Sequence, residues 1–356
     1  MSRDQTMRSD VERAFAEDGA RKTSVGGQAL IEGIMMRGST HWSVAVRKLD
    51  GSMHTEEHEL ASGKAGRKWM RWPLVRGCVA LVESLGLGFK ALKIAAQHAF
   101  NESDSQEGKS ASAAERAACS SQADDRQKKK ADEEFGTAEM TISLVLGVLL
   151  GIALFIVVPA FIANLLVGDY DTNALAWNLV DGIFRVVVFV FYVWLIGRMS
   201  DIKRMFAYHG AEHKTIHCYE HELELTPENA RVFPCLHVRC GTAFLIMVMI
   251  VAIVVYSLVP LNPLLDHWGI TNSVVKFLVV LAVRLAFLPI IAGIAYEITV
   301  KWAGARPENQ LVKVILWPGM QMQRLTTNEP DDEQLECAIA AMKLVLAHED
   351  EHEELV

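Results

Sequence analysis

The chain has 356 residues, of which 51% are hydrophobic, and its formal net charge is −8. A negative net charge disfavours the general attraction between proteins and nucleic acids, so we expect no nucleic-acid partner. Residues 1–135 are mostly polar, residues 140–300 are mostly apolar, and residues 301–356 are polar again. This distribution predicts a membrane-spanning centre between two polar regions.

The first 22 residues are charged and lack an apolar core, so we expect a disordered tail and no signal peptide. A small β unit follows over residues 24–60. It contains the apolar run Gln28–Met36, broken by Glu32 and Gly33, and the alternating segment Ser43–Leu49. Asp50-Gly51 then gives a strong hairpin signal.

Residues 72–99 predict an amphipathic helix, because charged side chains interrupt an otherwise apolar stretch. Trp69 and Trp72 suit a membrane interface, and a re-entrant segment is the alternative. Together with the β unit this helix forms a predicted region over residues 23–100. Residues 101–134 contain no aromatic residue and are rich in Ser, Ala and charged residues, which predicts a disordered linker.

Four segments within residues 135–300 are long and apolar enough to span a membrane. Met140–Val167 and Gly241–Leu261 carry no charge over 28 and 21 residues, and two further spans, Ala174–Gly197 and Ser273–Ile298, contain internal charges. The sequence therefore predicts a mainly α-helical, multi-pass membrane protein with four transmembrane helices, a small N-terminal β unit and a cytoplasmic amphipathic helix.

Charge in the loops predicts the orientation. The first and third loops lack Lys and Arg, whereas the central loop, residues 198–240, is basic. The positive-inside rule therefore places both termini and the central loop in the cytoplasm, with the spans in the cell membrane. The six cysteines are then expected to be reduced, which favours metal binding or packing over disulfides.

Three ionisable residues fall within the spans: Asp181, Arg185 and Arg284. Such residues are costly in lipid and usually face the interior of the bundle, often in pairs. Asp181 and Arg185 are four residues apart and share a helix face. They predict either a polar cavity or substrate path, or a structural ion pair between Asp181 and one of the arginines, with outward snorkelling of Arg185 as a further alternative.

The central loop is rich in histidine. His209, His213 and His217 are four residues apart, so their side chains form one stripe if residues 202–222 continue the second span as a helix. His209, Glu212 and His213 match the pattern H-x-x-E-H, in which two histidines hold zinc and the glutamate is the general base. His237 and Cys240 offer further ligands. A divalent metal there, zinc or another, would activate water, and Glu212 would shuttle the proton.

Two questions about this site stay open from the residues alone. The pattern needs a distant glutamate as a further ligand, and Glu297 is a candidate because it ends a span on the same side. The histidines and glutamate could instead form a buried hydrogen-bond network that braces the loop. In the polar region 301–356, Trp317-Pro318-Gly319 predicts a helix break, and a final helix is expected from about Pro330–Asp332 to His348.

Several long segments resemble the YqhQ-like bacterial membrane proteins, a family classed as domain of unknown function 1385. The resemblance covers residues 23–345 and is carried by Gly26–Gly38, Tyr208–Lys214, His237–Thr242, Pro318-Gly319 and Gln323–Thr327. One departure is Val238, where the family pattern has proline. The resemblance implies a metal-dependent enzyme without an established reaction, and it supports His209, Glu212, His213, His237 and Cys240 as site residues.

Two functions from different classes follow. The first is a membrane-embedded metal-dependent hydrolase that acts on a membrane protein, a peptide or a lipid. The second is a non-catalytic membrane assembly or scaffold factor, which docks partners through its cytoplasmic parts. A transporter is a distant third, since four spans are few for one chain.

Overall fold

The computed structural model describes residues 10–17, 23, 25–60, 72–99, 142, 145–168, 173–259, 261–270, 272–304, 306 and 308–353. The predicted linker at residues 101–134 lies outside this range, as does Cys119. The chain divides into two compact units, residues 1–101 with 190–356, and residues 102–189. The first unit contains the sheet and the candidate site.

The elements of the first unit, in chain order, are α1 (Asp10–Ala16), β1 (Gly26–Leu30), β2 (Gly33–Arg37), β3 (His41–Arg47), β4 (Met53–Glu59), α2 (Val75–Ala99), α6 (Ser200–Glu220), α7 (Pro227–Arg231), α8 (Gly241–Leu258), α9 (Leu261–His267), α10 (Ser273–Tyr296), η4 (Glu297–Ala303), α11 (Gln310–Thr326) and α12 (Asp332–Glu353). The helix α5 (Ala174–Ile196) crosses from the second unit into the first.

The predicted β unit is an antiparallel sheet of four strands in the order β1-β2-β3-β4. A two-residue turn joins β1 to β2, and its second residue, Glu32, has a positive φ of 51°. The predicted hairpin at Asp50-Gly51 is confirmed between β3 and β4, where Gly51 has φ 81°. Glycine adopts this conformation without a steric penalty, which explains the turn.

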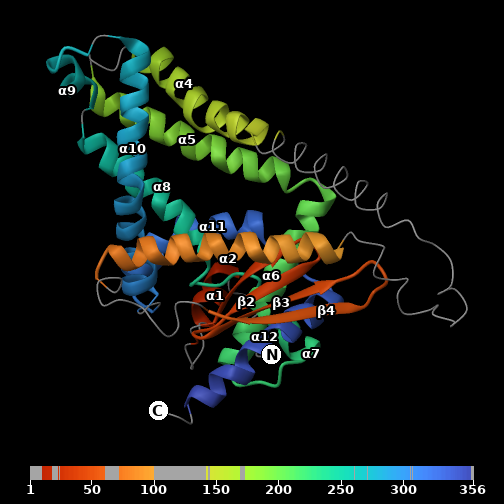
Figure 1. Ribbon diagram of the computed structural model, residues 1–356. Coiled ribbons are helices and arrows are strands. Elements are labelled where there is room, and N and C mark those ends of the chain that lie inside the picture. The colour runs from red at the N-terminus through yellow and green to blue at the C-terminus, as the bar shows by residue number, and fades with distance from the viewer. Residues whose placement is uncertain are drawn as a thin grey trace, which may run out of the picture. The chain divides into compact units, whose positions relative to one another are not determined.

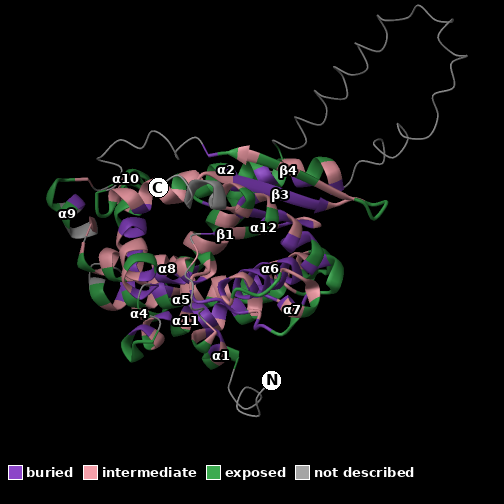
Figure 2. Ribbon diagram, turned by 90° about the horizontal axis from the view of Figure 1, so that it is seen from below, coloured by how far each residue is buried: buried purple, intermediate pink, exposed green. Residues whose placement is uncertain are grey.

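Both faces of the sheet are covered by helices (Figure 1). Side chains alternate along a strand, so Ile34 and Met36 pack with Leu335 and Met342 of α12, whereas Met35 packs on the other face with α2. The strand β3 and the helix α6 are largely buried in Figure 2. The N-terminal β unit and the C-terminal helix therefore share one hydrophobic core.

The four predicted spans are confirmed as helices that are long and apolar enough to cross a membrane. They are Val145–Val167, Leu175–Ile196, Gly241–Leu258 and Val274–Ala303. The orientation of the loops and termini stays a prediction.

The second unit contains the π-helical turn η3 (Ala153–Val157), α4 (Val158–Val167) and most of α5. Here Arg185 forms an ion pair of 2.7 Å with Asp181, four residues earlier on α5, and Asp181 is only 4% exposed. Arg284 belongs to the other unit, where its guanidinium lies 5.1 Å from the ring centroid of Tyr256. The structural ion pair is thus present as Asp181–Arg185.

Two predictions about local structure are wrong. Residues 10–16 of the expected disordered tail form α1, because Val11 and Ala14 are buried against Leu236 and Met320. The expected break at Pro318 lies inside the continuous helix α11. Packing of α11 against α8 outweighs the lost backbone hydrogen bond there.

Candidate metal centre

The helix α6 carries the histidine stripe. It begins at Ser200, after a turn at residues 197–199 that ends α5, so the predicted helical stripe stands although the two helices are separate. His209, His213 and His217 are four residues apart and therefore lie on one face. His213 and His217 are almost fully buried, so the stripe points into the protein.

Cys240 reaches the stripe from the far end of the central loop. It is the N-cap residue of α8, and its sulfur accepts a hydrogen bond of 3.4 Å from the backbone N–H of Thr242. Gln323 of α11 holds the preceding turn through two bonds of 2.9 Å: its Oε1 accepts from the N–H of His237, and its Nε2 donates to the carbonyl of His237. The candidate centre is thus located where a candidate span begins.

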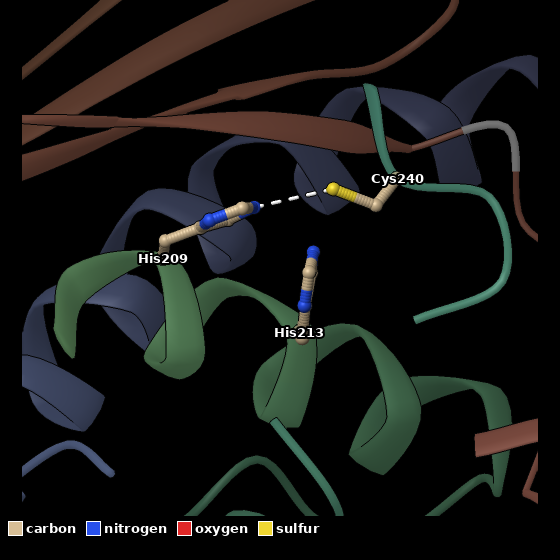
Figure 3. Close-up of side chains that lie close together, drawn as sticks. All are labelled: His209, His213 and Cys240. Carbon is tan, nitrogen blue, oxygen red and sulfur yellow. Dashed lines mark hydrogen bonds between the residues drawn. The ribbon is translucent and has the colours of Figure 1, made fainter. Parts of the chain in front are cut away.

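His209, His213 and Cys240 converge, with ligand atoms all within 4.8 Å of one another (Figure 3). The Nε2 atom of His209 lies 3.2 Å from the sulfur of Cys240. The Nε2 atom of His213 is buried and has no hydrogen-bond partner among the described residues. Two imidazole nitrogens and one sulfur therefore face a common point.

Backbone carbonyls fix both rings in this orientation. The Nδ1 atom of His209 lies 2.8 Å from the carbonyl oxygen of Thr326, and Nδ1 of His213 lies 2.6 Å from that of Cys235. A carbonyl can only accept, so each Nδ1 donates a proton. In a neutral ring, Nε2 then keeps its lone pair toward Cys240, as in histidines that hold metals.

Glu212 lies beside this cluster and is 5% exposed. The backbone N–H of Gly27 donates to its carboxylate, whose Oε2 has no hydrogen-bond partner among the described residues. A Cβ atom at Gly27 would approach Cδ of Glu212 to 2.8 Å, so only glycine fits there without a shift. Burial raises the pKa of Glu212, against the opposing effect of His209 and His213.

The close approach of these groups changes the pKa of Cys240 and the pKa of His209. Burial disfavours the thiolate of Cys240, but His213 and His209 together lower its pKa well below the ordinary value. Burial likewise disfavours protonation of His209, but Cys240 and then Glu212 raise its pKa to about 9. Without a metal, the sulfur and the His209 ring therefore favour a thiolate–imidazolium pair, in which the sulfur is already a ligand in its charged form.

His237 belongs to a second, adjacent group with His217 and Glu220, all three buried. Both ring nitrogens of His217 face carbonyl oxygens, those of Glu17 at 2.9 Å and Leu236 at 3.0 Å. Glu220 pairs with Arg239. Burial is the first cause that lowers the pKa of His217 and of His237 well below the ordinary value. Two other atoms of the group, Nε2 of His237 and Oε2 of Glu220, lie 3.6 Å apart and have no hydrogen-bond partner among the described residues. We call His217, Glu220 and His237 the bracing group.

The structure therefore separates the predicted site residues. His209, His213, Glu212 and Cys240 meet, whereas His237 lies in the bracing group. Glu297 forms an ion pair with Arg76 of α2 and belongs to neither group. The hydrogen bonds of Gln323 to His237 and the contact of Gly27 with Glu212 could not be predicted from the sequence, since both join segments far apart in the chain.

The sequence model of a family described as Protein of unknown function (DUF1385) matches residues 72–348. A relative from Bacillus subtilis (strain 168), "Uncharacterized protein YqhQ", is 32% identical over 321 residues, which are 90% of this chain and 92% of the relative. The chain belongs to the DUF1385 family. No solved structure matches the chain.

Membership of the DUF1385 family confirms the resemblance inferred from the sequence segments. Those segments meet in the structure: β1 contacts Glu212 through Gly27, and Gln323 of α11 binds the backbone of His237. The candidate metal centre thus lies where the segments of the resemblance come together.

Proposed function

We propose that this DUF1385 protein is a membrane-embedded, metal-dependent hydrolase with His209, His213 and Cys240 as metal ligands. The observation that carries the proposal is the convergence of three donor atoms, one of which, Nε2 of His213, is buried without a hydrogen-bond partner among the described residues. A buried polar atom without a partner costs free energy, and a bound cation would remove that cost.

The donor set fits a divalent transition metal. Two imidazole nitrogens and one thiolate are ligands that zinc prefers, and three protein ligands with a fourth position for water or substrate are typical of catalytic zinc. The two Nδ1–H donors to carbonyl oxygens supply the outer hydrogen bonds that orient such histidines. When bound, the ion would supply a Lewis acid that polarises a carbonyl or phosphoryl oxygen and makes water more acidic.

Glu212 is the proposed proton shuttle. Its carboxylate lies next to two ligands, and burial raises its pKa, which makes it a better proton acceptor than an ordinary carboxylate. The N–H of Gly27 holds one side of the carboxylate, so the other oxygen is available for a water proton. In this role Glu212 accepts the proton of the attacking water and passes it to the leaving group.

The substrate class follows from the position of Cys240 at the start of α8, a candidate span. A site at the end of a span lies near the membrane surface, which favours a membrane protein, a peptide or a lipid as substrate. The helix α2 exposes Val82, Leu85 and Phe89 and suits a membrane interface. The basic charge of the central loop supports a cytoplasmic position for this side under the positive-inside rule.

The test uses the full chain purified in detergent without a polyhistidine tag. Elemental analysis is expected to find bound zinc or another divalent metal, and His213→Ala is expected to lose the metal of this centre. Glu212→Gln should keep the metal but lower hydrolysis of an activated ester or a fluorogenic peptide library by about 10²–10⁴-fold. A folded wild-type chain that holds no metal at this centre would sink the proposal.

A non-catalytic assembly or scaffold factor is the second candidate function, and burial favours it. His213 is 1% exposed and Glu212 is 5% exposed, as in closed structural centres. In that role the centre and its bracing group would hold α6, α8 and α11 together as a docking platform. Metal bound by wild type and by Glu212→Gln, with no hydrolysis by either and with partners that co-purify, would select this candidate.

A further inference from the structure

A second convergence of metal-ligand side chains lies at the other edge of the sheet. His54, Glu56 and His58 alternate along β4, so all three side chains lie on the same face of this edge strand. His98, in the last turn of α2, reaches the same place. The ligand atoms of His54, Glu56 and His98 all lie within 4.8 Å of one another.

The carboxylate of Glu56 is the centre of this group. Its Oε1 lies 2.8 Å from Nε2 of His54 and 3.7 Å from Nε2 of His98, and its Oε2 lies 3.1 Å from Nε2 of His58. The rings of His54 and His98 stack with centroids 3.7 Å apart and an interplanar angle of 21°. Three imidazole nitrogens thus surround one carboxylate.

These distances are close to those of a metal site. Zinc–ligand bonds of about 2.0–2.2 Å in a tetrahedron place neighbouring ligand atoms roughly 3.4 Å apart. The side chains of His54, Glu56, His58 and His98 are 24%, 31%, 40% and 20% exposed, so an ion can enter from solvent without unfolding the strand. Glu56 is a hard ligand and the imidazoles are borderline, a set that suits zinc, nickel, cobalt and iron(II).

This group is separate from the candidate metal centre. That centre contacts β1 through Gly27, whereas the second group lies on β4, and β2 and β3 stand between these two edge strands. Strands are spaced about 4.8 Å apart, so the edges are roughly 14 Å apart. The second group also contains no cysteine, which gives it a different chemical signature.

We propose that His54, Glu56 and His98, with His58 as a further ligand, form a second site for a divalent transition metal. An ion bound there joins the C-terminal end of α2 to the edge strand β4. The site fixes the helix on this face of the sheet. It does not depend on the proposed hydrolase function.

Cobalt(II) is the probe, because a thiolate ligand gives it a strong charge-transfer band in the near ultraviolet and a nitrogen–oxygen site does not. The tag-free full chain in detergent is loaded with cobalt(II), freed of unbound ion and analysed for metal content. The variants are His98→Gln and Glu56→Gln. The matched control is His348→Gln, since His348 pairs with Glu57 and stacks on His41 outside the group.

His98→Gln and Glu56→Gln are each expected to lose about one equivalent of cobalt(II) relative to wild type. Their affinity for cobalt(II) at the second site should fall by at least about tenfold, while the thiolate band is unchanged. His348→Gln should bind as wild type does. The Cys240→Ser chain should lose the thiolate band and still bind cobalt(II) at the second site.

Wild-type cobalt content in both His98→Gln and Glu56→Gln would overturn the proposal, as would a folded Cys240→Ser chain that binds none. Absence of the thiolate band alone would count against the first centre and leave this one standing.

Discussion

The Nε2 atom of His209 lies 3.2 Å from the sulfur of Cys240, although 31 residues separate them along the chain. This contact closes the central loop, because it joins the middle of α6 to the N-cap residue of α8. Three supports hold it in place: the carbonyl of Thr326, the N-cap hydrogen bond of Cys240, and Gln323 behind His237. Substitutions that remove one of these supports should therefore lower the metal affinity of the candidate metal centre.

Gln323→Leu should lower metal affinity without touching a ligand. Gln323 is fully buried and makes two hydrogen bonds to the backbone of His237, three residues before Cys240. Its loss leaves the buried N–H of His237 without a partner, at a cost of about 1–3 kcal/mol, whereas the carbonyl of His237 keeps a bond of 3.3 Å from the N–H of Cys240. The turn then shifts, and we expect metal affinity to fall about 10–100-fold.

The measurement for this variant is a zinc competition titration, with thermal unfolding in parallel. Gln321→Leu is the control, since Gln321 lies on the same helix but is only partly buried. Unchanged affinity in Gln323→Leu, with the expected loss of stability, would show that Gln323 supports the fold and does not position the ligand turn.

Gly27→Ala should disturb Glu212 and destabilise the protein. The added Cβ would lie 2.8 Å from Cδ of Glu212 and 2.9 Å from the carbonyl oxygen of Met35. Such overpacking typically costs about 1–3 kcal/mol and forces the glutamate to move. We expect a lower Tm and, if Glu212 is the proton shuttle, lower hydrolysis with metal content unchanged.

Gly26→Ala is the matched control, because a Cβ there has no atom within 4 Å. Its effect should stay within about 0.5 kcal/mol, as for most surface substitutions. Equal Tm values for the two alanine variants would contradict the close approach of β1 to α6.

The spans, the Asp50-Gly51 turn and the histidine stripe of α6 could be predicted because each depends on local pattern. A run of apolar residues, a turn dipeptide and a four-residue spacing carry their structural consequence within one segment. The packing of α12 on the sheet could not be predicted, since Ser43 donates to the carbonyl of Ala341 across 298 residues. No local signal encodes such a contact.

In the candidate site, too, the residues with a local signal could be predicted, and those that depend on contacts between distant segments could not. His209, Glu212 and His213 were predicted from their spacing, but the choice between His237 and Cys240 depends on how the loop turns after Pro234. The group on β4 had a local signal that was missed, the alternation of His54, Glu56 and His58 on one strand face. Its fourth member, His98, comes from another element. The continuous helix at Pro318 shows again that packing between helices overrides local preference.

Metal should protect Cys240 from alkylation and leave Cys78 unchanged. Without metal, His213 and His209 lower the pKa of Cys240 despite its burial, which favours the reactive thiolate form. A bound ion engages that sulfur and competes with the alkylating reagent.

Cys78 is the internal control: it is also partly exposed, but it lies on α2, where its thiol is 2.9 Å from the carbonyl of Pro289. Labelling with iodoacetamide followed by peptide mass spectrometry should show that zinc slows modification of Cys240 at least about tenfold relative to chelator-treated protein, with the same Cys78 rate in both samples. Equal Cys240 rates with and without zinc would mean that the sulfur is not a ligand, and the contact with His209 would then be only a thiolate–imidazolium pair.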